Sequence, residues 1–470
     1  MEEKTKMLKE KLFRKSESGW YTSPNLDEIF DYAEGYIDFL NHSKTEREAV
    51  KYFKQKLDEN GFKDICDVTS LAPGDKVYYI NHHKNIYAAI IGSEDFKEGF
   101  NIIGAHIDSP RLDLKPNPLY EDTSLAMLKT HYYGGIKKYQ WLNIPLSMHG
   151  VFIKKDGEKV EVNIGEDEND PIFTIADLLP HLSDWQEKKK LSEAIDPEKF
   201  NILVGSMPYT TEEEKDNVKL NVLSILNKKY GIVERDFVSS EIEFVPAFKA
   251  RSLGFDRSMV AGYGQDDKAC AYPSLTALLK QENLTRTSIC ILADKEEVGS
   301  MGNTGMSSHN FEYFIQKLIE KTNTKASIHE IYKNTLVLSA DVTAAYNPNY
   351  QDIYEKNNES YLGHGLSLIK YTGSASKGGA SDANAEYIGF VRKMFEEKNI
   401  AYQNSEMGKI GVGGGGTIAY ILADRGMNVV DCGISLLSMH SPYEITSKFD
   451  LYNAYLGYQT FYQNAETFKD

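Results

Sequence analysis

The 470-residue sequence is poor in cysteine and has no long apolar run. Its four scattered cysteines form no CxxC pair, which argues against a disulfide framework and a thiolate zinc site. No stretch is apolar enough to span a membrane, and the charged residues from Glu2 to Lys11 are not typical of a signal peptide. We therefore expect a cytoplasmic protein. The cysteines are Cys66, Cys270, Cys290 and Cys432.

Basic charge is also scarce. The chain has 53 Lys and Arg against 69 Asp and Glu, a formal net charge of −16. Binding to nucleic acid or to an anionic membrane depends on clustered cations, so neither partner is expected. The length and the 41% of hydrophobic residues are sufficient for a large core and favour two domains.

Apolar runs and helical patterns alternate along most of the chain. Thr45 and Glu48 predict a capping box that begins a helix ending near Gly61. Strand-like runs recur at 100–105, 289–293, 336–339 and 429–434, separated by amphipathic stretches such as 272–281. This alternation predicts an α/β fold in which helices flank a central sheet.

Residues 128–245 have a different character. Their charge-rich alternating segments and the turn pair Asp156-Gly157 are typical of β-hairpins. We expect a β-rich insertion at 128–245 that splits the α/β domain into 1–127 and 246–470.

His106 and Asp108 form the first chemical motif. In an extended backbone, residues two apart share one face, so the histidine could bind a metal while the aspartate orients it. A structural or surface histidine is the alternative interpretation.

Glu296 and Glu297 follow an apolar run, where ligand sites of open α/β sheets lie. One carboxylate could bind metal while the other acts as general base on a metal-bound water. The alternative is a solvated acidic loop.

Asp341 and His440 also follow apolar runs, whereas Asp266 and Asp267 precede a helical stretch and could be ordinary helix-start acids. Two histidines and three carboxylates supply six bonds if one aspartate bridges two ions, and a shared water then makes each ion four-coordinate. Nitrogen and oxygen ligands suit zinc and are compatible with cobalt or manganese. This is hydrolase chemistry.

A glycine run at 411–416 could let backbone approach a substrate closely, with Gly415 and Gly416 as candidates; the alternative is a flexible turn. Lys370 and Lys377 flank a Gly/Ser-rich segment and could hold a substrate carboxylate, or be simply solvated.

Five motifs together resemble one family, the aspartyl aminopeptidase and vacuolar aminopeptidase I group of dinuclear zinc peptidases. The motifs that carry this resemblance are Gly104 to Pro110, Asp294 to Ser300, Ser339 to Val342, Gly414 to Thr417 and Ser438 to Ser441. The resemblance implies an aminopeptidase that acts on peptides with free N-termini. It implies that one metal is bound by His106, Asp266 and Asp341 and the other by Asp266, Glu297 and His440, with Glu296 as general base and Asp108 as partner of His106.

The resemblance also implies that the insertion builds a dimer, that dimers assemble into a tetrahedral dodecamer, and that an insertion histidine enters the neighbouring active site. His149 is at the matching place, and Lys370 matches a lysine of the substrate pocket. Members that recognise acidic first residues have an aromatic residue and an arginine where this chain has Gly378-Gly379, so acidic specificity is not implied. A related dinuclear deacylase and a catalytically silent scaffold are the alternative functions.

Overall fold

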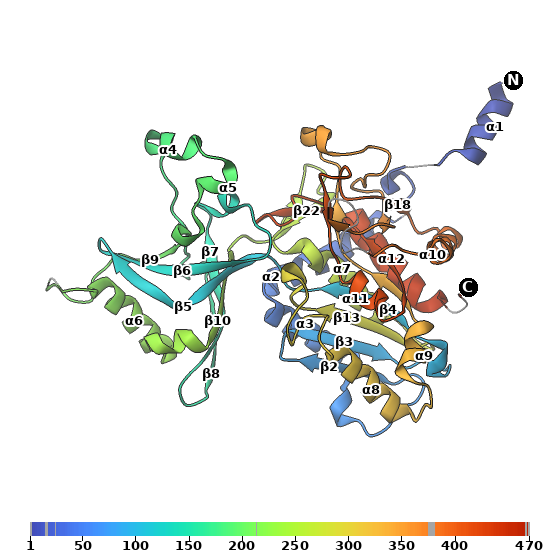
Figure 1. Ribbon diagram of the computed structural model, residues 1–470, viewed down its shortest axis with the longest axis horizontal. Coiled ribbons are helices and arrows are strands. Elements are labelled where there is room, and N and C mark those ends of the chain that lie inside the picture. Colours follow the sequence, from blue (N-terminus) through green and yellow to red (C-terminus); the bar gives the residue numbers. More distant parts are fainter. Residues whose placement is uncertain are drawn as a thin grey trace.

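The structure, a computed structural model, describes residues 2–14, 17–23, 25–212, 214–374, 381–465 and 468. Figure 1 shows an α/β domain beside a β-rich insertion, with the N-terminal helix α1 (Glu2–Leu12) projecting from the α/β domain. Among the helices of these residues, none is long and apolar enough to cross a membrane.

A nine-stranded sheet forms the centre of the α/β domain. Neighbouring pairs β13–β4, β4–β14 and β14–β20 are parallel, as the predicted alternation of strands and helices requires. In spatial order the strands are β1 (Lys63–Asp64), β2 (Lys76–Asn81), β3 (Asn85–Ile90), β13 (Ser288–Ala293), β4 (Asn101–His106), β14 (Leu336–Ser339), β20 (Asn428–Gly433), β16 (Leu366–Ile369) and β18 (Tyr402–Asn404).

Helices cover both faces of this sheet because its central strands are apolar on both sides. In β4, Ile103 belongs to the core under one helical layer and Ile102 to the core under the other. The first layer contains α2 (Leu26–His42), α3 (Glu46–Glu59), α7 (Gln265–Leu279), α10 (Ala385–Glu397) and α12 (Lys448–Asn464). The second contains α8 (Asn310–Thr322), α9 (Ile328–Lys333) and α11 (Ala419–Ala423). The predicted α/β fold is confirmed.

Helix α3 begins as its sequence predicts. The Thr45 side chain accepts the N–H of Glu48, and the Glu48 carboxylate accepts the N–H of Thr45, which completes the capping box. Its buried face, formed by Ala49, Val50, Phe53 and Leu57, packs into the core.

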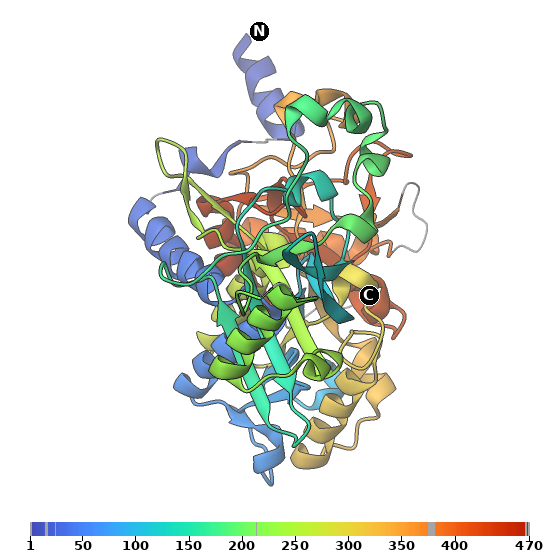
Figure 2. The same ribbon diagram turned by 90° about the vertical axis from the view of Figure 1, so that its left-hand side faces the viewer.

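The insertion is a six-stranded sheet with its own core, and Figure 2 views the molecule from its side. The order is β8 (Lys159–Ile164), β7 (Leu146–Ile153), β10 (Ser240–Pro246), β5 (Arg111–Asp122), β6 (Leu125–Tyr133) and β9 (Ile202–Gly205). The short helices α4 (Asp184–Glu187) and α5 (Leu191–Ala194) and the longer α6 (Asn217–Tyr230) accompany it.

The sheet of the insertion starts at Arg111, so the expected boundary at residue 128 falls inside β6. In the sequence, Pro116 and Pro118 argue against a strand at 111–122, because proline has no N–H to donate to a neighbouring strand. β5 accommodates them at a register shift between Leu114 and Leu119 in its pairing with β6.

A five-stranded sheet is formed by strands from the second part of the α/β domain, residues 246–470. Its order is β11 (Arg251–Leu253), β12 (Met259–Gly262), β22 (Glu444–Ser447), β21 (Ser435–Leu437) and β15 (Thr343–Ala344). A separate pair, β17 (Gly373–Ser374) and β19 (Gly414–Gly415), lies in the glycine-rich region.

Candidate metal centre

Six predicted site residues meet at one edge of the central sheet. Because β13, β4 and β14 are parallel neighbours, the residues at their C-terminal ends lie together. The six are His106 at the end of β4, Asp341 after β14, Glu296 and Glu297 in the short helix η8 (Glu296–Val298) after β13, Asp266 at the beginning of α7 and His440 after β21.

The first possible ligand group contains His106, Asp266 and Asp341, whose ligand atoms lie within 4.8 Å of one another. His106 Nε2 is 3.2 Å from Asp266 Oδ1 and 3.9 Å from Asp341 Oδ1. All three residues are buried.

The second group shares Asp266 with the first and adds Glu297 and His440. His440 Nε2 is 3.1 Å from Asp266 Oδ2 and 3.3 Å from Glu297 Oε2. The two oxygens of Asp266 therefore face two different histidines, as a bridging carboxylate would. Asp267 points elsewhere, since its Oδ2 accepts the backbone N–H of His106 at 3.2 Å.

Glu296 lies next to these groups. Its Oε2 is 3.9 Å from His106 Nε2. Burial raises the pKa of Glu296 to about 7, a value at which a carboxylate can both take up and release a proton near neutrality.

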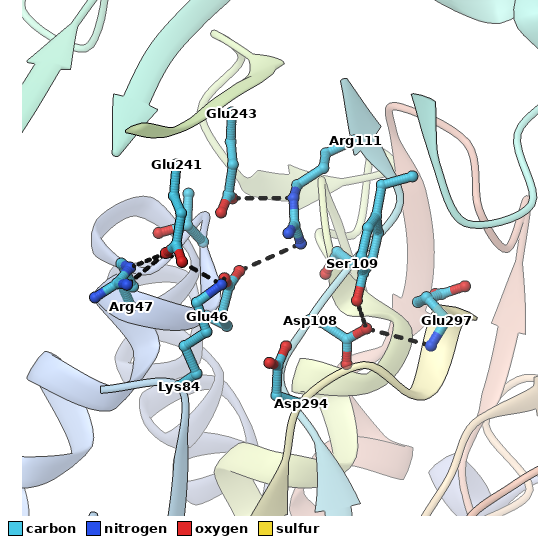
Figure 3. Close-up of polar contacts among 12 residues, drawn as sticks. Glu46, Arg47, Lys84, Asp108, Ser109, Arg111, Glu241, Glu243, Asp294 and Glu297 are labelled. Atoms are coloured by element: carbon cyan, nitrogen blue, oxygen red, sulfur yellow. Dashed lines mark hydrogen bonds and ion pairs between the residues drawn. The ribbon is translucent and has the colours of Figure 1, made fainter. Parts of the chain in front are cut away.

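Asp108 connects the first histidine to the two glutamates. Its Oδ1 is 3.3 Å from His106 Nδ1 and accepts the backbone N–H of Glu296 at 3.1 Å. Its Oδ2 accepts the N–H of Glu297 at 3.2 Å and the hydroxyl of Tyr133 at 2.7 Å (Figure 3). One buried carboxylate thus fixes the imidazole and the turn that carries both glutamates.

The insertion orients the second histidine. The carbonyl oxygen of Gly135 lies 2.9 Å from His440 Nδ1 and can accept its proton, which directs Nε2 toward the metal side. A Cβ on Gly135 would lie 3.2 Å from His440 Nδ1, and one on Gly134 would lie 3.3 Å from Glu297 Oε2. Both contacts are tight, so a side chain at either position would require His440 or Glu297 to shift by a few tenths of an ångström.

Sequence reasoning missed Glu444. Its buried carboxylate accepts the backbone N–H groups of Gln265 (2.6 Å), Asp266 (3.2 Å) and His440 (2.7 Å), and so holds together segments that carry ligands of both groups. Burial, followed by the charge of Asp266, raises the pKa of Glu444 to about 8. Nothing in the local sequence marks this glutamate.

The donor set fits divalent cations. Burial and then the neighbouring carboxylates raise the pKa of Glu297 and Asp341 well above the usual range, so the cluster is unfavourable without a compensating charge. Glu297 Oε1 is buried and has no hydrogen-bond partner among the described residues. Imidazole nitrogens and carboxylate oxygens are ligands that zinc accepts.

His149 does not belong to this centre. It is 1% exposed on β7, where Nδ1 lies 2.7 Å from Glu48 and Nε2 lies 3.2 Å from Glu166 of its own chain. A side chain buried in this way cannot extend into a neighbouring subunit. The structure therefore gives His149 a structural role in place of the predicted contact with substrate.

The other predicted substrate contacts lie around β17 and β19. Lys370 is exposed just after β16, Gly415 belongs to β19, and Gly416 follows it. In the part of the chain that the structure describes, no hydrogen bond or ion pair joins these three residues to the metal centre. Lys377 and the Gly378-Gly379 pair lie outside the described residues.

Comparisons with known proteins identify the family. The family described as "Aminopeptidase I zinc metalloprotease (M18)" matches residues 39–462. A probable M18 family aminopeptidase 1 from Clostridium acetobutylicum is 50% identical over 461 residues, which cover 96% of this chain and 99% of the relative.

Solved structures share the fold. An M18 family aminopeptidase from Thermotoga maritima has a TM-score of 0.93 at 45% identity, covering 96% of this chain and 99% of the other. A more distant structure, an S. cerevisiae mApe1 dodecamer, has a TM-score of 0.76 at 21% identity, covering 93% of this chain and 98% of the other. The chain therefore belongs to the M18 family of zinc metalloproteases and is an aminopeptidase that hydrolyses N-terminal peptide bonds.

Proposed function

We propose that this aminopeptidase uses two divalent ions per chain, with zinc as the first choice and cobalt or manganese compatible on ligand type. The observation that carries the proposal is the position of Asp266, whose two oxygens face His106 and His440. One ion would be held by His106, Asp266 and Asp341, and the other by Asp266, Glu297 and His440.

When bound, such ions lower the pKa of water and polarise a peptide carbonyl. Glu296 Oε2 then accepts the proton of the attacking water and later donates it to the leaving amine. This role is supported by the position of Glu296, whose Oε2 lies 3.9 Å from His106 Nε2 beside the proposed ligands. Asp108 keeps His106 and the backbone of Glu296 in place through the contacts described above.

The proposed substrates are peptides with a free α-amino group. With zinc added, chromogenic aminoacyl amides should be cleaved, and the corresponding N-acetylated amides should not. Release of acetate from the acetylated amides, with the chromophore still attached, would instead indicate a deacylase.

The general base is tested by Glu296→Gln. Its amide cannot accept the water proton, so kcat should fall by at least about a thousandfold, within the range that general-base and associated electrostatic effects supply. Metal content should stay at the wild-type level. Glu320→Gln, an exposed change on α8, is the matched control and should keep full activity. Undiminished turnover of Glu296→Gln would disprove the role of Glu296 as general base. A wild-type protein without bound metal and without turnover would instead favour a catalytically silent scaffold.

We further propose self-association through the insertion, to a dimer and then a dodecamer. The S. cerevisiae mApe1 dodecamer supports this, as do exposed apolar side chains around α4 and α5. These side chains are Leu178, Leu179, Leu182, Trp185 and Leu191. An insertion histidine that enters a neighbouring active site must be exposed. His181 in this segment is exposed, whereas His149 is buried. Native mass spectrometry measures the number of chains.

A reducing compartment, the cytoplasm, is the proposed location. It is supported by the four cysteines, which are all free thiols.

A further inference from the structure

A cleft rich in basic side chains lies between the insertion and the α/β domain. Its cavity has a volume of about 860 Å³, within the range of pockets that hold small organic ligands, roughly 300 to 1,000 Å³. Helix α3, the turn between β2 and β3 and the segments on either side of η8 line it from the α/β domain, and β7, β8 and β10 line it from the insertion. The basic residues of this lining are Arg47, His82, His83, Lys84, Lys159 and Lys295.

Among the described residues that line the cavity, Glu241 is the only carboxylate, and two of the cations share it. Arg47 Nε donates to Glu241 Oε2 at 2.7 Å, and Lys84 Nζ lies 3.2 Å from the same oxygen (Figure 3). Lys84 Nζ also lies 3.1 Å from Oε1 of the buried Glu46, outside the lining. These two cations are therefore held in place, and one exposed carboxylate is all that opposes them within the cavity.

The remaining cations are less compensated. Lys159 Nζ lies 2.9 Å from Glu161, but the side chain of Glu161 is 59% exposed, so this pair is weak. Lys295 has no ion pair in the part of the chain that the structure describes. Burial, and then the charges of Lys159 and Arg47, lower the pKa of His83. The cleft is a positive region in a chain of net charge −16, and it attracts anions.

Buried amides hold the two sides of the α/β lining together. Asn81 Nδ2 donates to the carbonyl oxygen of Asn303 at 2.8 Å, and Asn85 Nδ2 donates to that of Thr304 at 2.7 Å. These bonds connect the turn that carries His82, His83 and Lys84 to the loop after η8. A ligand would meet cations on a fixed frame, so its binding requires little ordering of the chain.

A second cavity, of about 390 Å³, continues the cleft along α3 and β8. It shares Arg47, His83, Val151 and Lys159 with the first cavity. Its carboxylates are already paired, Glu48 with His149 and Glu161 with Lys159. The second cavity therefore offers room for an organic group beside the basic cavity. Its apolar lining consists of Val50, Ile80, Val151 and Val162.

We propose that the two cavities together bind a small molecule with two or more phosphate groups, such as a nucleoside diphosphate. The phosphates lie among Arg47, Lys84 and Lys295, because a guanidinium binds phosphate oxygens in pairs and lysines add point charges. The organic part lies along Ile80 and Val151 in the second cavity. No proposed metal ligand lines either cavity, so the inference does not rest on the proposed function.

The wild-type protein provides the first test. ADP, pyrophosphate and adenosine are titrated into the zinc-loaded protein in a calorimeter. ADP should bind with a Kd below about 1 mM, pyrophosphate more weakly, and adenosine without measurable heat in this range. Because the main contacts join opposite charges, raising the salt concentration from about 50 to about 500 mM should weaken ADP binding at least about threefold.

Two variants connect binding to the cleft. Arg47→Gln removes the guanidinium, and Lys159→Glu reverses a charge at an exposed position, so each should weaken ADP binding by at least about tenfold. The controls are Arg392→Gln and Lys188→Glu, which make the same charge changes in exposed ion pairs outside the cleft and should keep the wild-type affinity.

Thermal unfolding distinguishes binding from chelation of zinc. ADP bound in the cleft should raise the melting temperature of the wild type and of both controls more than that of Arg47→Gln. Chelation acts on all of these proteins alike and produces no such difference.

Equal ADP affinity in the cleft variants and their controls would overturn the inference, as would the absence of binding by both ADP and pyrophosphate up to about 5 mM. Pyrophosphate that binds as tightly as ADP, and is lost in the same variants, would support the cleft with an inorganic ligand.

Discussion

Tyr133, at the end of a strand of the insertion, donates a 2.7 Å hydrogen bond to Asp108 at the metal centre. Asp108 in turn accepts the backbone N–H groups of Glu296 and Glu297. The insertion therefore contributes to catalytic geometry within one chain, in addition to any role between chains.

Removal of this hydroxyl tests the connection. Tyr133→Phe should lower kcat by about tenfold to a hundredfold with little change in KM, because a hydrogen bond to a charged acceptor contributes about 1.5–3 kcal/mol. Bound metal and the melting temperature should stay near wild-type values. Tyr132→Phe, at the exposed neighbouring position, is the control. An unchanged kcat in Tyr133→Phe would show that Asp108 is positioned without this bond.

A buried ionic cluster joins the insertion to the α/β domain (Figure 3). Arg111 Nη1 lies 3.3 Å from Glu46 of α3, and Arg111 Nε lies 3.3 Å from Glu243 of β10. Both carboxylates are almost inaccessible to solvent. Arg111→Met should therefore destabilise the protein by about 3–5 kcal/mol, since it removes the cation beside buried Glu243 and leaves Glu46 paired with Lys84 alone among the described residues.

The melting temperature measured by calorimetry checks this expectation. Lys51→Met removes an exposed ion pair with Glu161 and serves as the control, with an expected effect below about 1 kcal/mol. Equal melting temperatures for the two variants would mean that water or rearrangement compensates the buried carboxylates.

His149 predicts a pH dependence of stability. Burial disfavours its charged form, but Glu48 and Glu166 outweigh burial and raise the pKa of His149 above 6.5. Because the folded-state pKa exceeds that of the unfolded chain, this stabilisation is fully present below about pH 6.5 and disappears as the pH rises through the folded-state value.

The comparison is between wild type and His149→Gln. The difference in their melting temperatures should be largest at pH 6 and should decrease steadily toward pH 9. Exposed His309→Gln should give no such trend. A difference that is constant over this range would show that His149 stabilises the fold without its charge.

Periodicity and strand-end position were sufficient to predict much of this structure. The Thr45 capping box predicted α3, and the apolar runs predicted β4, β13 and β14, because each rests on local propensity and a buried face. Parallel strands bring their C-terminal ends together, so His106, Glu297 and Asp341 could be predicted to meet.

The remainder depends on contacts between distant residues. Glu444 accepts N–H groups that lie 178 and 179 positions away, and no local pattern indicates which partner a lone glutamate will find. The burial of His149 could not be predicted for the same reason. It results from contacts with Glu48 and Glu166, which come from two different domains. The strand at 111–122 was missed because its prolines contradict strand propensity.

Metal stoichiometry, measured by plasma mass spectrometry on the dialysed protein, tests the central claim that Asp266 is shared between two ions. The account predicts two ions per chain in the wild type, about one in His440→Ala, and loss of both in Asp266→Ala with the fold retained by circular dichroism. One ion per chain in the wild type, or two ions retained in Asp266→Ala, would contradict it.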